Sequence, residues 1–144
     1  MKVMDFVNRE IQTVSPWATV REATERMRAA GTGFLPVCEA DGQLVGVLTD
    51  RDVAVRAVAE GRDVDETTVR DVMTEEAVCC YEHVSAAEAL ELMKDEGVRR
   101  LLVVDRANRF VGVATLEDPE SFADAGGSGP PAGLLAVSWT APAA

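Results

Sequence analysis

The chain has 144 residues, of which 47% are hydrophobic and 5% aromatic, and its formal net charge is −11, so it suits one ordinary domain or two half-size modules that share a core. The negative charge argues against a nucleic acid polymer or an anionic membrane surface as partner, because both attract clustered Lys and Arg. Since no segment approaches the ~20 apolar residues of a membrane span, and the first residues lack the apolar run of a signal peptide, we expect a cytoplasmic protein.

A strand and a helix are predicted at the start of the chain. Residues 11–14 form a short run that favours a strand. Thr19 and Glu22 have the spacing of a capping box, in which each side chain bonds to the backbone amide of the other residue. Apolar residues then recur at helical spacing until Gly31, a typical C-cap residue. We therefore expect a helix over residues 20–30.

Two strands and a second helix follow. The apolar runs 34–38 and 44–48 flank the pair Asp41-Gly42, which is typical of a hairpin turn. The second run leads directly into a helix that we expect to begin at Thr49 and to end at Gly61. Four apolar residues are expected to form the buried face of this helix: Val53, Ala54, Ala57 and Val58.

The second half of the chain repeats the first after a shift of 66 residues. Without a gap, residues 5–52 align with residues 71–118 and match at 14 of 48 positions. The stretches 44–52 and 110–118 share the Gly, the Val on each side of it, the Thr and the final Asp. Such self-similarity indicates a tandem duplication. Because a repeat of this size is marginal alone, the two halves are expected to pack together.

The duplication predicts the domain organisation. Repeat 1 covers residues 1–62, a polar linker covers 63–70, and repeat 2 covers 71–124. Residues 125–144 form a Gly/Pro-rich linker and an apolar tail, which is either a docking segment or inert. Repeat 2 should replay the order of repeat 1 with a strand at 77–81, a helix from the cap Ser85 to Gly97, strands at 101–104 and 110–114, and a last helix opened by Thr115.

The cysteines have two interpretations. Cys38, Cys79 and Cys80 lie in β-like apolar runs without CxxC spacing, where a cysteine behaves as a small hydrophobe. Together with His83, the only histidine, they could instead build a metal or redox site, although a tetrahedral zinc site needs four ligands. In a cytoplasmic protein we expect no intrachain disulfide among them.

Two pairs of motifs resemble those of the CBS domain family. Residues 46–52 and 112–118 fit its signature of Gly, two apolar residues, Thr or Ser, two free positions and Asp, and residues 31–37 and 97–103 fit its second block. The chain, over residues 5–123, resembles a stand-alone CBS pair (a Bateman module) of the small bacterial kind, including the mycobacterial hypoxic-response type. The resemblance implies an α/β (α+β) fold of tandem repeats, each strand-helix-strand-strand-helix, packed sheet to sheet about a pseudo-twofold axis.

The Thr-x-x-Asp of each signature can act in two ways. As helix caps, Thr49 with Asp52 and Thr115 with Asp118 would satisfy backbone amides and oppose the helix dipole. In the family, the matching Thr and Asp contact the ribose and phosphates of adenine nucleotides, in clefts where the two repeats meet. A helix N-terminus suits phosphate as well. The resemblance therefore implies one candidate nucleotide site in each repeat.

The two implied sites are not equivalent. Arg99 and Arg100 stand in repeat 2 where the family often has a phosphate-binding basic residue, and Arg can bind phosphate through two hydrogen bonds. Repeat 1 has Gly33 and Phe34 at the same positions, so we expect the phosphate-dependent site to use Asp118. The complete set of candidate nucleotide-binding residues is Phe34, Pro36, Thr49, Arg51, Asp52, Arg99, Arg100, Thr115 and Asp118.

These features predict a non-enzymatic regulatory sensor. It would bind AMP, ADP, ATP or a related adenosyl ligand, require no cofactor, and signal to an unknown protein partner through its dimer geometry. One histidine and no nucleophile-base pair argue against an enzyme. The alternatives are a ligand-free structural or interaction module, and a metal or redox sensor that uses the cysteines.

The resemblance also implies how the chain should pack. We expect a homodimer formed through apolar helix faces, and four valines buried between the sheets. The helix faces would carry Met27, Val53, Leu92 and Met93, and the buried valines would be Val45, Val47, Val111 and Val113.

Overall fold

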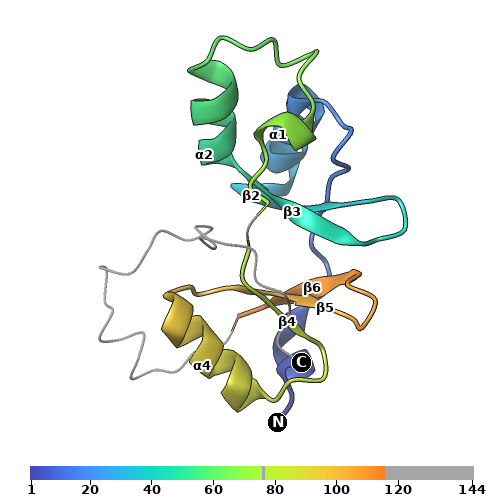
Figure 1. Ribbon diagram of the computed structural model, residues 1–144, viewed down its shortest axis with the longest axis vertical. Helices are drawn as coiled ribbons and strands as arrows, with labels where there is room; N and C mark the ends of the chain where they lie inside the picture. Colours follow the sequence, from blue (N-terminus) through green and yellow to red (C-terminus); the bar gives the residue numbers. More distant parts are fainter. Residues whose placement is uncertain (76, 116–144) are drawn as a thin grey trace.

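The computed structural model describes residues 1–75 and 77–115, in which two layers of strands face each other and helices cover their outer sides (Figure 1). This arrangement confirms the mixed α/β class and the tandem repeats. The elements are η1 (Val3–Phe6), β1 (Val7–Asn8), α1 (Val20–Ala30), β2 (Phe34–Cys38), β3 (Leu44–Thr49), α2 (Asp50–Asp52), η2 (Val53–Val58), α3 (Val69–Val72), β4 (Cys79–Tyr81), α4 (Ala86–Glu96), β5 (Leu101–Val104) and β6 (Phe110–Ala114).

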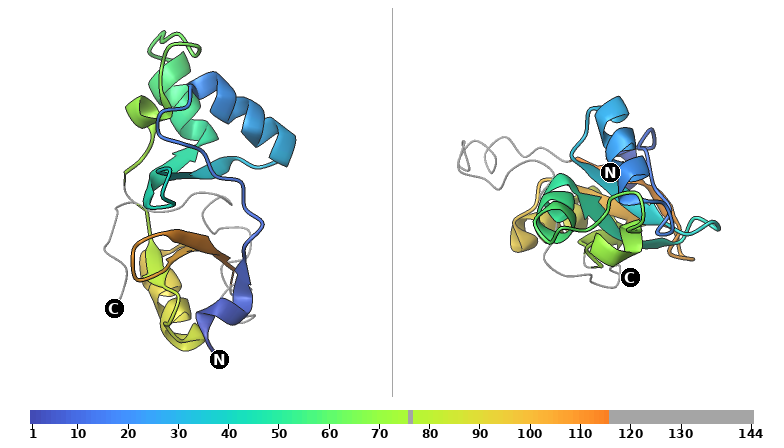
Figure 2. Two further views of the ribbon diagram at one scale, coloured as in Figure 1. Left: turned by 90° about the vertical axis from the view of Figure 1, so that its right-hand side faces the viewer. Right: turned by 90° about the horizontal axis from the view of Figure 1, so that it is seen from above.

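In the part of the chain that the structure describes, the strands form two separate sheets. The first consists of the antiparallel pair β2-β3, and the second has the order β1-β6-β5-β4. Within the second sheet β5 pairs antiparallel with β6 and parallel with β4. Figure 2 shows the two sheets stacked, with α1 on the outer side of one and α4 on the outer side of the other.

Equivalent loops of the two repeats bond to each other, as a pseudo-twofold axis requires. The backbone amide of Leu44 donates to the carbonyl of Asn108 at 3.0 Å, and the amide of Phe110 donates to the carbonyl of Gly42 at 2.9 Å. Each bond becomes the other under the 66-residue shift. Both Gly42 and Asn108 have positive φ, 91° and 64°, so the tight hairpin turn recurs although only one repeat has glycine there.

Each repeat lends its leading residues to the other repeat. We call residues 1–8 lead segment 1 and residues 67–74 lead segment 2. Lead segment 1 adds β1 to β6, the last strand of the second sheet, while lead segment 2 pairs with β3 through the bridge between Val47 and Thr74. Part of the polar stretch 63–70, expected as a linker, is therefore built into the fold of repeat 1.

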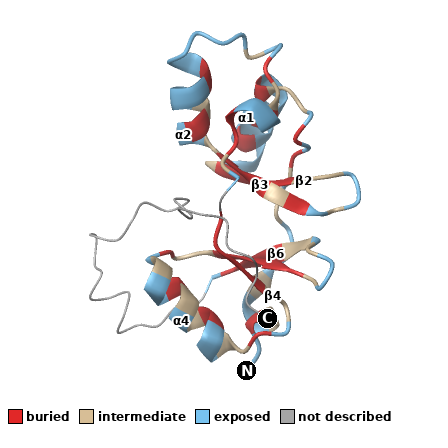
Figure 3. Cartoon of the chain, viewed as in Figure 1, coloured by how far each residue is buried: buried red, intermediate tan, exposed pale blue. Residues whose placement is uncertain are grey.

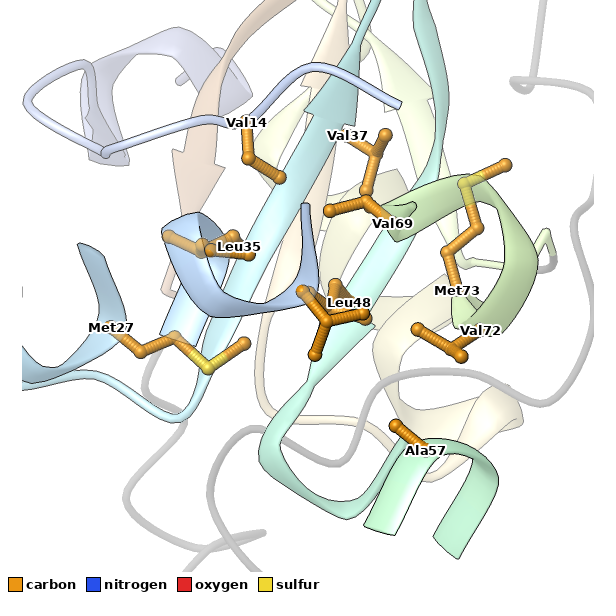
Figure 4. Close-up of a cluster of buried hydrophobic side chains, with 11 residues drawn as sticks. Val14, Met27, Leu35, Val37, Leu48, Ala57, Val69, Val72 and Met73 are labelled. Carbon is orange, nitrogen blue, oxygen red and sulfur yellow. The ribbon is translucent and has the colours of Figure 1, made fainter. Parts of the chain in front are cut away.

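Among the described residues, the buried side chains form three clusters. Figure 3 marks the buried residues in red along the strands and helices. One lies between α4 and the four-stranded sheet and includes Val3 from lead segment 1. Another lies between α1 and the two-stranded sheet and includes Val69 and Val72 from lead segment 2 (Figure 4). The third joins both sheets and includes Val47 and Val113.

A β-bulge in each hairpin corrects the prediction for the four valines. Val37 pairs with Gly46 but the next residue pairs with Leu44, so Val45 is the extra residue of the bulge. The bulge reverses the side-chain alternation, so that Val45 is only half-buried and packs with the α1 cluster, whereas Val47 is buried between the sheets. The same irregularity in the second hairpin leaves Val111 half-buried and Val113 buried.

Three further predictions about repeat 1 need correction. Residues 11–14 do not form a strand; only Val14 makes a bridge, to Val37. The helix after Thr49 is not a regular α-helix, because the amide of Ala59 donates to the carbonyl of Ala54, five residues earlier, as in a π-helix. The wider turn buries Ala57 and leaves Val58 64% exposed. Of the other two residues in that predicted face, Val53 is half-buried and Ala54 is exposed.

The predicted helix caps are confirmed in part. The hydroxyls of Thr19 and Ser85 accept hydrogen bonds from the amides of Glu22 and Glu88, each at 3.1 Å, but the return bond of a capping box, from the cap amide to the Glu side chain, is absent at both of these described helices. Gly31 and Gly97 end the two helices with φ of 67° and 68°. No helix within residues 1–75 and 77–115 has the length and apolar character to cross a bilayer. The predicted last helix and the tail 125–144 lie outside the described residues.

Two of the four residues that were predicted to lie on an exposed helix face and to form the dimer contact are buried. Met27 and Met93 are buried in the core, 5% and 1% exposed, so neither lies on an outer helix surface. Val53 and Leu92 are half-buried. Among the described residues, the large apolar side chains that are exposed on helices are instead Phe6 on η1 and Val55 and Val58 on η2.

Candidate functional site

The end of β3 presents the Thr-x-x-Asp motif of repeat 1 as a complete capping box. The amide of Asp52 donates to the Thr49 hydroxyl at 3.1 Å, and the amide of Thr49 donates to Oδ2 of Asp52 at 3.0 Å. Phe34 lies beside Thr49, as its partner in the β2-β3 register. Asp52 is only 8% exposed, so its carboxylate is held inside the boundary between strand and helix.

Lead segment 2 adds a residue that the sequence did not suggest. The Thr74 hydroxyl lies 3.0 Å from Oδ1 and 3.1 Å from Oδ2 of Asp52. Its position is fixed by two backbone hydrogen bonds of 2.9 Å to Val47. No local pattern reveals this contact, because Thr74 is 22 residues from Asp52 and reaches it only through the exchange of lead segments.

The repeated glycine of each signature has a steric reason. A Cβ on Gly46 would lie 2.6 Å from the carbonyl oxygen of Thr74, and one on Gly112 would lie 2.5 Å from the carbonyl oxygen of Asn8. Both distances are shorter than a side-chain carbon tolerates, so the lead segments approach these strands only because the residue is glycine. The motif therefore holds the exchanged segment as well as opening a helix.

Two candidate residues from different repeats meet beside this motif, because Phe34 pairs with Thr49 in the β2-β3 register. The guanidinium carbon of Arg100 lies 5.0 Å from the centroid of the Phe34 ring, within the range of a cation-π contact. Phe34 and Arg100 are equivalent under the 66-residue shift, so they face each other across the pseudo-twofold axis. Arg100 thus belongs to the boundary between the repeats and not to repeat 2 alone.

The remaining candidate residues differ in how far their side chains are exposed to solvent. Pro36 is buried within β2, Arg99 is half-buried, and Arg51 and Thr115 are exposed. Thr115 directly follows β6, in the place that corresponds to Thr49. Asp118 lies outside the described residues. The structure therefore brings together Phe34, Thr49 and Asp52 with Arg100 and the unforeseen Thr74, while roles for the others stay predictions.

In repeat 1, Gly33 takes the position of Arg99 and lies next to a carboxylate. The carbonyl of Gly33 accepts a hydrogen bond from the amide of Asp50 at 2.8 Å, and a Cβ on Gly33 would lie 2.9 Å from Oδ2 of Asp50. A phosphate at this position would meet a carboxylate in place of a guanidinium. This electrostatic difference agrees with the expected inequality of the two sites.

Two clefts of the described surface lie away from the candidate residues. The larger, of about 540 Å³, is lined by residues that include Trp17, Arg26, Cys38 and Glu39. The smaller, of about 260 Å³, lies beside α1 and η2 and includes Arg21, Val58 and Val64. Neither includes a predicted nucleotide-binding residue.

The cysteines are placed as core residues. Cys79 and Cys80 point to opposite faces of β4 and belong to different core clusters, and Cys38 is half-buried. Burial raises the pKa of each thiol to about 12. Among the described residues, no three His, Cys, Asp or Glu side chains lie close enough together to hold a metal ion. His83 is exposed and stacks on Tyr81, with ring centroids 5.4 Å apart.

The chain belongs to the CBS domain family. The family model of the CBS domain matches twice, at residues 3–58 and 69–118. The chain is 41% identical over 116 residues to the CBS domain-containing protein YhcV of Bacillus subtilis, and covers 81% of each protein. It is 32% identical over 114 residues to Hypoxic response protein 1 of Mycobacterium tuberculosis, covering 79% of each. These matches confirm the resemblance to stand-alone CBS pairs.

Solved structures share the fold. Hypoxic Response Protein I, solved with two coordinated zinc ions, has a TM-score of 0.70 and 30% identity, with 80% of this chain and 93% of that chain covered. CBSX2 in complex with AMP has a TM-score of 0.66 at 24% identity, covering 88% and 96%. The CBS pair of MJ0100, in complex with 5′-methylthioadenosine and S-adenosyl-L-methionine, has 0.64 at 23%, covering 86% and 98%. The last two likenesses concern the fold alone.

Proposed function

We propose that this CBS pair is a non-enzymatic regulatory module that binds an adenine nucleotide or a related adenosyl ligand at the boundary between its repeats. The observation that carries the proposal is the meeting of candidate residues from both repeats at this boundary, with the Phe34 ring under the Arg100 guanidinium. An aromatic ring can stack on a base, and a guanidinium can bind phosphate through two hydrogen bonds. Ligand occupancy would bias the relative positions of the repeats, because both contribute to the site.

The relatives support the choice of ligand class. CBSX2 and MJ0100, which share the fold, were solved with AMP and with adenosyl compounds, so this architecture accommodates such ligands. In our proposal the ribose hydroxyls are bound by the carboxylate of repeat 2, Asp118, and the phosphates by Arg99 and Arg100. Thr115 follows β6 and would supply a hydroxyl beside them.

The second candidate function is a ligand-free interaction module. It is favoured by one observation, namely that the Asp52 carboxylate already accepts the Thr49 amide and the Thr74 hydroxyl. In that case each Thr-Asp pair acts only as a helix cap. A metal sensor is less favoured, although Hypoxic Response Protein I was solved with zinc, because the described cysteines and His83 do not gather into one ligand set.

Calorimetric titration with adenosine, AMP, ADP and ATP tests the proposal. Asp118→Ala should lower the affinity for all four ligands at least about tenfold, since each lost charge-assisted hydrogen bond to ribose costs about 1.5–3 kcal/mol. Arg100→Ala should lower the affinity for ADP and ATP more than the affinity for adenosine, because only the phosphates bind to the guanidinium. Glu117→Ala is the matched control, a neighbouring carboxylate that the proposal does not use. An unmodified chain that binds none of the four ligands would leave the interaction module as the better description.

A further inference from the structure

The Asp52 carboxylate is already engaged in the way that a ribose would engage it. A ribose presents adjacent hydroxyls, and the Thr74 hydroxyl lies almost equally far from the two carboxylate oxygens, 3.0 and 3.1 Å. Oδ2 also accepts the Thr49 amide at 3.0 Å. With Asp52 only 8% exposed, little of the carboxylate remains for a third partner.

Thr74 is not free to withdraw as a whole. Its amide and carbonyl both bond to Val47 at 2.9 Å, and its carbonyl oxygen sits against Gly46. A ligand would have to turn the hydroxyl away while the backbone stays in place. It would then replace one hydroxyl-carboxylate bond with another, which yields little net binding free energy.

We propose that Thr74 closes the repeat 1 site from within, by holding the place on Asp52 that a ligand hydroxyl would take. The inference rests on the proposed nucleotide binding and adds that a native chain takes up one nucleotide, through repeat 2. Thr74 is therefore the residue that decides how many sites a CBS pair of this sequence offers. Removing its hydroxyl leaves a buried carboxylate short of a hydrogen bond, and ribose hydroxyls can then satisfy it.

The test is the stoichiometry of AMP binding, measured by calorimetry on the full chain and its variants. Thr74→Ala removes the hydroxyl together with the volume that it fills and should raise uptake from one to two AMP per chain. Thr74→Ser keeps a hydroxyl and should behave as the unmodified chain. Thr68→Ala is the matched control, because Thr68 donates a similar hydroxyl-carboxylate bond to Asp71, at 3.0 Å, on the same lead segment. Thermal unfolding establishes that each variant is folded.

Adding Asp52→Asn to Thr74→Ala should abolish the second site. The inference is overturned if the unmodified chain binds two AMP and Asp52→Asn removes one, a result that would leave the proposed function standing. It is also overturned if folded Thr74→Ala has the same stoichiometry as the unmodified chain. If the unmodified chain binds no AMP, the proposed function fails. In that event a single site gained by Thr74→Ala supports the inference, and no gain overturns it.

Discussion

Single residues in this chain matter most where a lead segment touches the other repeat. Gly46 and Gly112 are the clearest cases, because each faces a backbone carbonyl, which cannot rotate away as the end of a side chain can. Thr74, whose carbonyl lies against Gly46, also donates its hydroxyl to Asp52. Gly46 therefore indirectly positions a hydroxyl at the candidate site. Packing and binding are thus linked at one residue of the motif.

We predict that Gly46→Ala lowers the free energy of unfolding by about 1–3 kcal/mol, the range for overpacking a rigid site. The new Cβ would meet the Thr74 carbonyl at 2.6 Å, so lead segment 2 must shift. Chemical denaturation measures the change. Gly33→Ala is the control, since its Cβ would meet only the end of the Asp50 side chain, which can rotate. Equal losses in the two variants would contradict the steric explanation.

We also predict that alkaline pH destabilises the fold through its thiols. Burial raises the pKa of Cys38, Cys79 and Cys80 to about 12 from the ordinary value of 9.0. Between these values the unfolded chain releases thiol protons that the folded chain retains, so stability is full below pH 9.0 and falls as the pH rises towards 12. Denaturation curves across this range should show the loss. A triple Cys→Ala variant should show less of it, and an equal slope would contradict the assignment.

At the scale of elements, the exchange of lead segments determines the packing of both repeats. Val3 and Val69 are equivalent under the 66-residue shift, and both are fully buried. Val3 packs in the α4 cluster of repeat 2, whereas Val69 packs in the α1 cluster of repeat 1. Each repeat is therefore completed by a segment that precedes the other repeat along the chain.

We expect the effects of Val3→Ala and Val69→Ala to cross between the repeats. Each substitution should cost about 2 kcal/mol through lost burial and an unfilled cavity. Because opening is local below the global transition, hydrogen exchange should speed up mainly in α4 and β6 for Val3→Ala, and mainly in α1 and β3 for Val69→Ala. If hydrogen exchange became faster only in the substituted residue's own repeat, the proposed swap of lead segments between the repeats would be contradicted.

On the scale of the whole molecule, two valines of η2 give the outer surface an apolar face. Val55 and Val58 are 50% and 64% exposed on η2, next to the half-buried Val53. Within the π-helical turn Val58 lies outward, although the apolar pattern predicted it in the buried face with Ala57. We propose this face, in place of Met27 and Met93, as part of a homodimer contact.

Light scattering at micromolar concentration tests that face. The unmodified chain should be a dimer, and Val58→Asp should be a monomer because a charge cannot be buried unpaired in an apolar contact. Trp17→Asp is the control, since Trp17 is 61% exposed but lies on a different part of the surface. A monomeric unmodified chain, or a dimer that survives Val58→Asp, would contradict the proposal.

The sequence was informative about local structure and about the motif. The hairpin strands, the caps at Thr19 and Ser85 and the C-terminal glycines follow from short-range patterns, and the structure has them as predicted. The bulges at Val45 and Val111 were missed because an alternating apolar run does not reveal an inserted residue. The π-helix was missed because the same run of apolar residues fits an α-helix or a π-helix. The two helices differ in which of these side chains face the core.

By itself, the sequence determined that the chain is a tandem duplication whose motifs resemble those of the CBS domain family, since repeated glycines, caps and apolar periods are properties of neighbouring residues. Only the tertiary structure decided which repeat each lead segment completes, and that Thr74, not a ligand, meets the Asp52 carboxylate. It also decided that Phe34 and Arg100 face each other. These contacts join residues far apart in the chain, and they depend on how two equivalent sheets stack about one axis, which no local pattern records.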